Sequence, residues 1–136
     1  MAQRVSGKVL AFIRSQRVAR VATVSRDGTP HNVAICPLAL SGRIYFASET
    51  GARKVRNLRR NPRAALAFDH YTENWKRLAG ALIVGTCTII ERGATFHRVR
   101  RALYRKYKQY ARVAPIEEGE SVIIALSPTR SFSWGL

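Results

Sequence analysis

The feature that most constrains the fold is an apolar run from Leu78 to Ile90 that contains no charged residue. Its many β-branched residues favour a strand, and the run is long enough to bend around a barrel. Gly80 and Gly85 interrupt it, and a glycine inside a strand commonly marks a bend or a bulge. The run therefore predicts one long, bent strand in a small β-barrel.

Further strands and helices are expected on both sides of this run. Apolar and β-branched segments predict strands over residues 18–24, 32–40, 43–48, 64–68, 78–90 and 121–126, with 131–134 extending or flanking the last. Apolar residues at helical spacing predict a helix after Ser6 that ends near Gln16, and helices over 50–60 and 96–110. Six antiparallel strands with short helices at their turns predict an α+β, mainly β, barrel. No repeat or linker divides residues 1–136, so we expect one domain.

The charge balance narrows the class of ligand. Twenty-four Lys and Arg stand against eight Asp and Glu, which gives a net charge of +16. Such an excess favours anionic partners, because the chain otherwise repels itself. No apolar run reaches the roughly 20 residues of a membrane-spanning helix, and cations interrupt the N-terminal apolar stretch, so we expect a cytoplasmic protein without a signal peptide.

Residues suited to nucleophilic or metal catalysis are scattered along the chain. Cys36 and Cys87 lie in apolar, strand-like sequence without C-x-x-C spacing, so we interpret both as small buried hydrophobic residues. His31, His70 and His97 occur singly, so no metal site is predicted. The motifs of α/β-hydrolases, Rossmann folds and P-loops are absent from the sequence. No catalytic side chain is predicted.

Residues 48–63, SETGARKVRNLRRNPR, contain the start of a basic helix. Arg53 and Lys54 fall in its first turn, where the helix dipole disfavours cations. Free backbone amides after Thr50 and Gly51, together with the two cations, suit a phosphate, which offers more acceptor oxygens than a carboxylate. The residues alone leave two interpretations open, an anion site and a solvated basic helix.

The helix expected over 96–110 is amphipathic and strongly basic. Eight Lys and Arg lie from Arg92 to Arg112 with no acidic residue after Glu91, interleaved with Tyr104, Tyr107 and Tyr110. The tyrosines fall partly on the apolar stripe, which favours core packing over base stacking. Nucleic-acid binding through this helix therefore stays an alternative function.

The stretch YFASETGARKVRNLRRNPRAALAF, residues 45–68, resembles the flavin-phosphate segment of the pyridoxamine 5'-phosphate oxidase-like split-barrel family. That family has a strand, Gly-x-Arg-Lys, a helix, Asn-Pro-Arg and a strand in this order. The likeness extends upstream through VATVSRDGTPHNVAI and downstream through the strand around Gly85. The resemblance implies a six-stranded antiparallel split β-barrel that binds FMN.

The resemblance also implies roles for individual residues. Arg53 and Lys54 would hold the flavin phosphate, with Ser48 as a hydrogen-bond donor and Thr50 nearby. Backbone around the isoalloxazine ring and ribityl chain would come from Val33, Ala34, Ile35, Cys36 and Ala47. Trp75 and Trp134 would pack against the ring or the substrate, or lie in the core or an interface.

Three departures refine the resemblance. The family often has Ser where Ala52 stands, and many oxidases have Arg where Val33 stands. The given sequence stops at Leu136, without the C-terminal extension that true pyridoxamine phosphate oxidases use for dimerisation and substrate recognition, so oxidation of pyridoxamine phosphate is not expected. RNLRRNPR, the Trp75–Leu78 segment and the Lys106–Tyr110 segment are similar to a short branch that uses cofactor F420, whose anionic tail would suit the basic surplus.

The implied function is two-electron transfer between bound FMN, or alternatively F420, and a small-molecule substrate, by a flavin-binding oxidoreductase. The family implies a homodimer with the cofactor between subunits. Two alternatives remain open, a non-catalytic flavin- or haem-binding protein and a basic nucleic-acid-binding domain.

Overall fold

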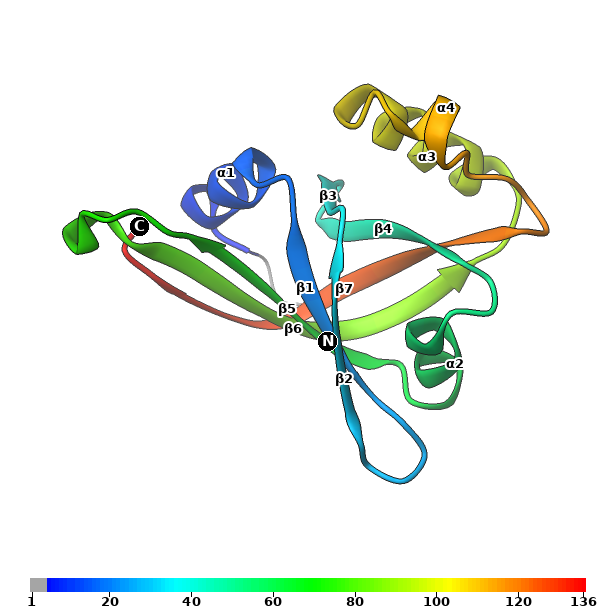
Figure 1. The fold of residues 1–136 in the computed structure, drawn as a ribbon, viewed down its shortest axis with the longest axis horizontal. Helices are drawn as coiled ribbons and strands as arrows, with labels where there is room; N and C mark the ends of the chain where they lie inside the picture. The colour runs from blue at the N-terminus through cyan, green and yellow to red at the C-terminus, as the bar shows by residue number, and fades with distance from the viewer. Residues whose placement is uncertain (1–4) are drawn as a thin grey trace.

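The computed structural model describes residues 5–136 as a curled antiparallel sheet with short helices around it (Figure 1). The helices are α1 (Gly7–Ser15), α2 (Arg53–Arg60), α3 (Ala94–Lys106) and α4 (Tyr110–Val113), with a 3₁₀ turn at Trp75–Arg77. The strands are β1 (Ala19–Val24), β2 (Pro30–Ile35), β3 (Leu38–Leu40), β4 (Arg43–Glu49), β5 (Arg63–His70), β6 (Ala79–Ile90) and β7 (Ser121–Trp134). The expected mainly β fold is confirmed.

The sheet order, β2-β1-β5-β6-β7-β4-β3, explains why the sheet curls. Its two edge strands, β2 and β3, are consecutive in the chain and are joined by Cys36 and Pro37 alone. A link of two residues spans only about 10 Å, so the edges must approach one another at that end. The prediction of one strand over 32–40 was wrong because Pro37 cannot donate to a ladder. The sheet described for residues 5–136 thus has seven strands instead of six.

The long strand predicted over 78–90 is confirmed as β6, and β7 runs beside it as far as Trp134. The register between them shifts at Val84 and Gly85, which confirms an irregularity at that glycine. A Cβ atom at Gly85 would lie 2.3 Å from the carbonyl oxygen of Ser127, so only glycine fits. Gly80 has a different role: a Cβ there would lie 1.9 Å from the Trp134 ring, which packs against it.

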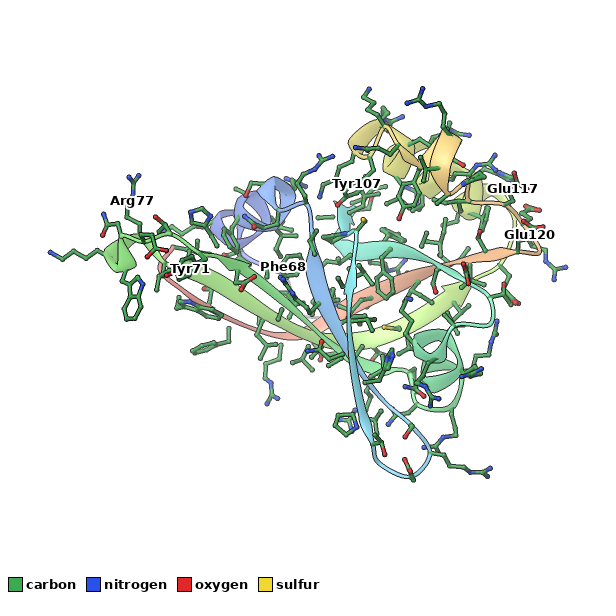
Figure 2. The ribbon with its side chains drawn as sticks, viewed as in Figure 1. Phe68, Tyr71, Arg77, Tyr107, Glu117 and Glu120 are labelled. Carbon is green, nitrogen blue, oxygen red and sulfur yellow. The ribbon has the colours of Figure 1, made fainter. Side chains whose placement is uncertain are left out.

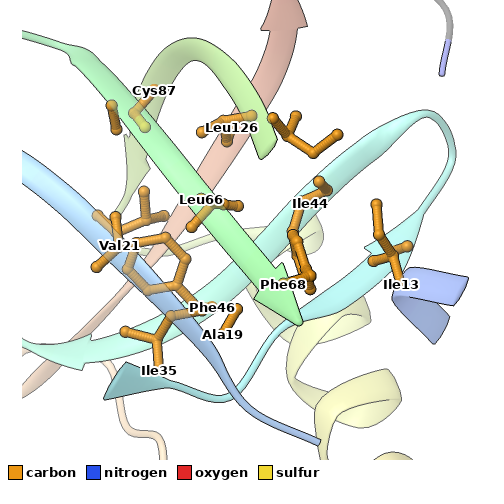
Figure 3. Packing of buried hydrophobic residues seen from close by; sticks show 14 of the residues in the cluster. Ile13, Ala19, Val21, Ile35, Ile44, Phe46, Leu66, Phe68, Cys87 and Leu126 are labelled. Atoms are coloured by element: carbon orange, nitrogen blue, oxygen red, sulfur yellow. The ribbon is translucent and has the colours of Figure 1, made fainter. Parts of the chain in front are cut away.

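Alternating residues of β4 and β7 bury both faces of the sheet. Phe46 on β4 and Ile124 on β7 belong to the core inside the curl, which Figure 3 shows around Leu66 and Phe68. Tyr45 and Ile123, one residue away, belong to a second core under α3. This period of two is the strand signature, and it places α3 on the outside of the sheet.

Helices α2 and α3 have boundaries that differ from the expected ones, whereas the start of α1 is as expected. The Ser6 hydroxyl accepts from the Val9 amide, which confirms the expected cap of α1. Helix α2 begins at Arg53 instead of residue 50. Helix α3 ends at Lys106 because Tyr107 turns inward, where its hydroxyl donates to the Pro37 carbonyl at 2.7 Å.

Candidate functional site

The N-terminus of α2 lacks a side-chain cap. Its N-cap residue is Ala52, which has no side-chain oxygen to accept from the first-turn amides. The Thr50 amide donates to the Glu120 carbonyl at 3.1 Å, and the Ala52 amide donates to the Glu49 carbonyl at 3.2 Å. Within residues 5–136 the amides of Gly51, Arg53 and Lys54 have no hydrogen-bonded acceptor. The expectation of free amides is therefore correct except at Ala52, and three donors at the start of the helix are without an acceptor among the described residues.

Two cations accompany these amides in the first turn, which contains no acidic residue. Arg53 is exposed. Lys54 is partly buried, and this burial lowers its pKa while the nearby Glu49 carboxylate opposes the shift. Cations at a helix N-terminus are unfavourable unless an anion is bound, because their charge adds to the positive end of the dipole.

Helix α2 and the β1–β2 hairpin enclose a cleft of about 820 Å³. Arg53, Arg56 and Arg60 line it from α2, because their i, i+3, i+7 spacing places them on one helix face. The hairpin contributes the remaining lining residues, Ser25, Arg26, Asp27, Thr29, Pro30 and His31, and Asn57 closes the base. Four guanidinium groups against one carboxylate make this cleft suited to an anion.

The single carboxylate in the cleft is already engaged by its own turn. Asp27 accepts from the Ser25 hydroxyl at 2.5 Å and from the Thr29 amide at 3.1 Å. These hydrogen bonds lower its pKa to about 2. The Asp27 charge therefore stabilises the hairpin and competes little for the arginines.

Buried contacts hold α2 against the sheet. The side chains of Val55 and Leu58 pack into the core, and Asn57 donates to the Thr23 hydroxyl of β1 at 3.0 Å. Arg60 donates to the Ser25 carbonyl at 3.0 Å. These contacts fix the helix face that carries the arginines relative to the hairpin.

The residues expected around a ring system are only partly brought together. Val33 is partly buried and Ala34 exposed on the edge strand β2, whereas the Ile35 side chain is buried in the core. The side chain of Cys36 is only partly buried and lines a separate cavity of about 350 Å³ with Tyr107 and Tyr110. The interpretation of Cys36 as a buried hydrophobic residue was wrong, and that of Cys87 is confirmed.

Residues at the end of β4 precede the anion position closely in sequence. Ala47 and Ser48 are partly exposed, and the Ser48 hydroxyl donates to the Glu49 carbonyl at 3.1 Å. Thr50 lines a different cavity, of about 380 Å³, with Glu91 and Glu118. The Ser48 hydroxyl is thus partly exposed, while Thr50 lines a cavity other than the arginine cleft.

Trp75 lies far from this site within one chain. It is 71% exposed in the connection between β5 and β6, which contains Tyr71 and Arg77 and lies at the opposite end of the molecule from α2 (Figure 2). Trp134 packs over Gly80 on the same arm of the sheet. Neither tryptophan contacts the α2 cleft within the described chain.

Sequence reasoning missed the arginines beyond the first turn. The spacing of Arg53, Arg56 and Arg60 was visible, but nothing in the sequence placed the hairpin residue Arg26 opposite them. His31 was set aside as an isolated histidine, whereas its Nδ1 atom is buried without a partner among the described residues at the rim of this cleft.

Residues 5–136 contain no cluster of three or more side chains suited to a metal ion. None of the described helices has both the length and the apolar character needed to cross a bilayer.

Comparison with solved structures shows the same fold in proteins of low sequence identity. The conserved hypothetical protein Rv2991 of Mycobacterium tuberculosis is 23% identical, with a TM-score of 0.82 over 98% of this chain and 86% of that one. HutZ, the haem storage protein of Vibrio cholerae, is 14% identical, with a TM-score of 0.77 over 96% and 94%. An F420 reductase is 22% identical, with a TM-score of 0.67 over 94% and 98%.

The sequence comparisons give the family. No curated protein matches the chain. The sequence model described as pyridoxamine 5'-phosphate oxidase matches residues 5–135. Because that match covers nearly the whole sequence, the chain belongs to the pyridoxamine 5'-phosphate oxidase family.

Proposed function

We propose that this protein is a cytoplasmic flavin-binding oxidoreductase that holds the phosphate of FMN at the N-terminus of α2. The observation that carries the proposal is the uncapped helix start, where three free amides and the Arg53 and Lys54 cations converge beside an arginine-lined cleft. These donors fit a phosphate because it offers several anionic acceptor oxygens to amides and cations at once.

The family-implied flavin also needs room for its ring beside the phosphate. The outer edge of β2 has no neighbouring strand, so the amides and carbonyls of alternate residues there are available to a ligand. Val33 and Ala34 on this edge, with Ala47 and Ser48 on β4, would orient the ring and exclude water from one side. The bound flavin would supply two-electron transfer, and the protein would supply position and electrostatics.

The extra arginines favour F420 as a second candidate cofactor. Arg26, Arg56 and Arg60 line the cleft in addition to Arg53 of the first turn. These are more cations than a single phosphate needs. A polyanionic tail would use them. The structural similarity to an F420 reductase supports the same candidate.

We propose that a second copy of the chain covers the arm of the sheet formed by the β5–β6 connection and the paired segments of β6 and β7 next to it. This second copy would complete the site. Large apolar side chains are exposed along this arm, namely Tyr71, Trp75, Leu82, Phe132 and Trp134. Leu82 and Phe132 are direct cross-strand partners, so they form one continuous apolar surface. Sedimentation velocity of the Phe132→Ser variant, compared with the unchanged protein, tests this dimer: dissociation is expected.

A non-catalytic haem- or flavin-binding protein is the alternative function, favoured by the similarity to the haem storage protein HutZ. The absorption spectrum of the purified protein separates the candidates. A Soret band indicates haem, and a blue-absorbing, fluorescent chromophore indicates a flavin or deazaflavin. Mass analysis of the released ligand then distinguishes FMN from F420.

A double variant tests the phosphate site directly. Arg53→Ala with Lys54→Ala removes two charge-assisted contacts, so FMN binding is expected to weaken at least about 100-fold in a fluorescence titration. The matched control, Arg101→Ala with Arg105→Ala, removes the same charge from exposed positions on α3 and should retain binding. Unchanged FMN affinity in a folded Arg53→Ala, Lys54→Ala variant would reject the site.

A further inference from the structure

A second basic surface lies on the opposite side of the fold from the hairpin cleft, on the exposed face of α3 and α4. Three of its residues, Arg98, Arg101 and Arg105, are spaced at i, i+3, i+7 along α3 and are exposed, and Lys108 and Arg112 follow in the turn and α4. Nitrogen-tipped side chains project from this outer side in Figure 2. Arg98 and Arg105 are about 10 Å apart along the helix axis. We call these five residues the α3–α4 basic face.

Within residues 5–136, the side chains of these five cations form no hydrogen bond or ion pair. The ion pairs of residues 5–136 involve Arg20, Arg59 and His97. Other cations of the same helix have structural partners: Arg100 donates to the Ile116 carbonyl and Lys106 to the Pro37 carbonyl. No described side-chain hydrogen bond or ion pair involves a member of the α3–α4 basic face. Its charge is therefore unneutralised within the described part of the chain.

The opposite face of α3 is fully committed to the core. Phe96, Val99 and Leu103 are completely buried there. An amphipathic helix that enters a lipid surface needs such residues free for insertion, so the geometry disfavours a membrane partner. The exposed side of α3 is dominated by arginine, whose planar group binds phosphate oxygens in pairs, and Val113 at the end of α4 is the large apolar side chain exposed beside it.

The tyrosines beside the basic face are also occupied. The Tyr107 hydroxyl donates to Pro37, and the Tyr104 hydroxyl accepts from the Ile116 amide at 2.9 Å. The Tyr104 and Tyr110 rings stack on one another with centroids 6.2 Å apart. Because the three rings already contact backbone or one another, the geometry favours contact with the phosphate backbone over base stacking.

We propose that the α3–α4 basic face binds the phosphate backbone of duplex nucleic acid without sequence preference. Five phosphate contacts predict a slope of about −4.5 for the logarithm of the association constant against the logarithm of salt concentration. Affinity then falls on the order of several hundredfold between 50 and 200 mM NaCl. This binding is independent of the flavin site on α2.

The test measures binding of the full chain to a fluorescein-labelled, random-sequence 20-base-pair DNA duplex by anisotropy over a range of NaCl concentrations. The variant Arg98→Gln, Arg101→Gln, Arg105→Gln should reduce the salt slope by roughly 2.7. The control variant Arg43→Gln, Arg63→Gln, Arg130→Gln makes the same change in net charge at exposed positions on three different strands. It should leave the slope nearly unchanged, and thermal melts of both variants verify folding.

Three results would overturn the proposal. The first is an equal loss of slope in both triple variants, which would assign binding to net charge alone. The second is unchanged duplex binding in the Arg98, Arg101, Arg105 variant. The third is an absence of duplex binding at 50 mM NaCl. Binding of the chain to vesicles that contain phosphatidylglycerol, without binding to the duplex, would likewise assign the face to a membrane and overturn the proposal.

Discussion

Two basic helices, α2 and α3, carry their charge in opposite ways. The arginines of α2 line a concave cleft with the β1–β2 hairpin, next to amides that lack acceptors. The arginines of the α3–α4 basic face project outward from a helix whose other side is packed into the core. Charge density alone does not separate a small-molecule site from a docking surface. A concave shape and unsatisfied hydrogen-bond donors do distinguish a small-molecule site, because they allow several protein groups to contact the same ligand group.

The largest predicted effect concerns the anchoring of α3. Leu103→Ala removes a fully buried side chain and should lower the free energy of unfolding by about 2–5 kcal/mol. Urea denaturation followed by circular dichroism measures it. The control, Arg101→Ala on the exposed face of the same helix, should change stability by less than about 0.5 kcal/mol. If Leu103→Ala and Arg101→Ala lowered the free energy of unfolding equally, α3 would not have one face packed in the core and one face exposed to solvent.

The next prediction concerns the anchoring of α2. Asn57→Ala leaves the buried Thr23 hydroxyl without its donor and should cost about 1–3 kcal/mol of stability. Because Asn57 also fixes the arginine face of α2, FMN affinity should fall in the same variant. Denaturation and fluorescence titration measure the two effects.

The double variant Thr23→Val, Asn57→Leu is the control for this prediction. It removes both polar partners at once, so it should recover much of the lost stability. A double variant as unstable as Asn57→Ala would mean that packing at this position, and not the hydrogen bond, holds α2 in place.

Local features of α2 could be predicted from the sequence, whereas the residues that surround its cleft could not. Arg53 and Lys54 were identified because cations in a first helical turn conflict with the dipole, which is a local signal. Ser48 came from the family resemblance alone, and its role stays a prediction. Arg26 and His31 were missed because their place in the cleft depends on how the β1–β2 hairpin packs against α2, and no local pattern encodes that contact.

The fold shows the same division between local and non-local information. The bent strand β6 was predictable from its apolar run and Gly85. The break at Cys36 and Pro37 was missed because both flanking segments have strand-like composition, and only the closure of the sheet separates them. Similarly, α3 was predicted four residues too long, because Tyr107 and Tyr110 keep the helical spacing although Tyr107 leaves the helix to bond Pro37.

A smaller, pH-dependent effect distinguishes the inward-facing cation of α3 from its outward-facing ones. Burial, reinforced by Arg17, lowers the pKa of Lys106 to about 8. The unfolded chain binds the proton more tightly between about pH 8 and the ordinary lysine pKa of 10.5, so Lys106 makes stability rise with pH in this window. Solvent screening limits the rise to under about 1 kcal/mol.

Denaturation of the unchanged protein and of the Lys106→Met variant is measured from pH 7 to 10. The difference between their free energies of unfolding isolates the contribution of Lys106. The comparison is needed because Cys87 also makes stability depend on pH. Burial raises the pKa of Cys87 to about 12, so stability falls above about pH 9 in both proteins, and this effect cancels in the difference. A difference that is flat with pH would contradict a buried position for the Lys106 ammonium.

The smallest predicted effect on stability is that of neutralising the α3–α4 basic face, and Arg60 on α2 provides the contrast. Arg60→Gln removes a donor to the Ser25 carbonyl and should cost about 1 kcal/mol, measured by thermal unfolding at low salt. The Arg98→Gln, Arg101→Gln, Arg105→Gln variant has no such bond to lose, so its stability should change by less than about 0.5 kcal/mol, with a slight gain where self-repulsion is relieved. A marked loss of stability in the triple variant would mean that the α3–α4 basic face serves the fold, and its charge would then need no external partner.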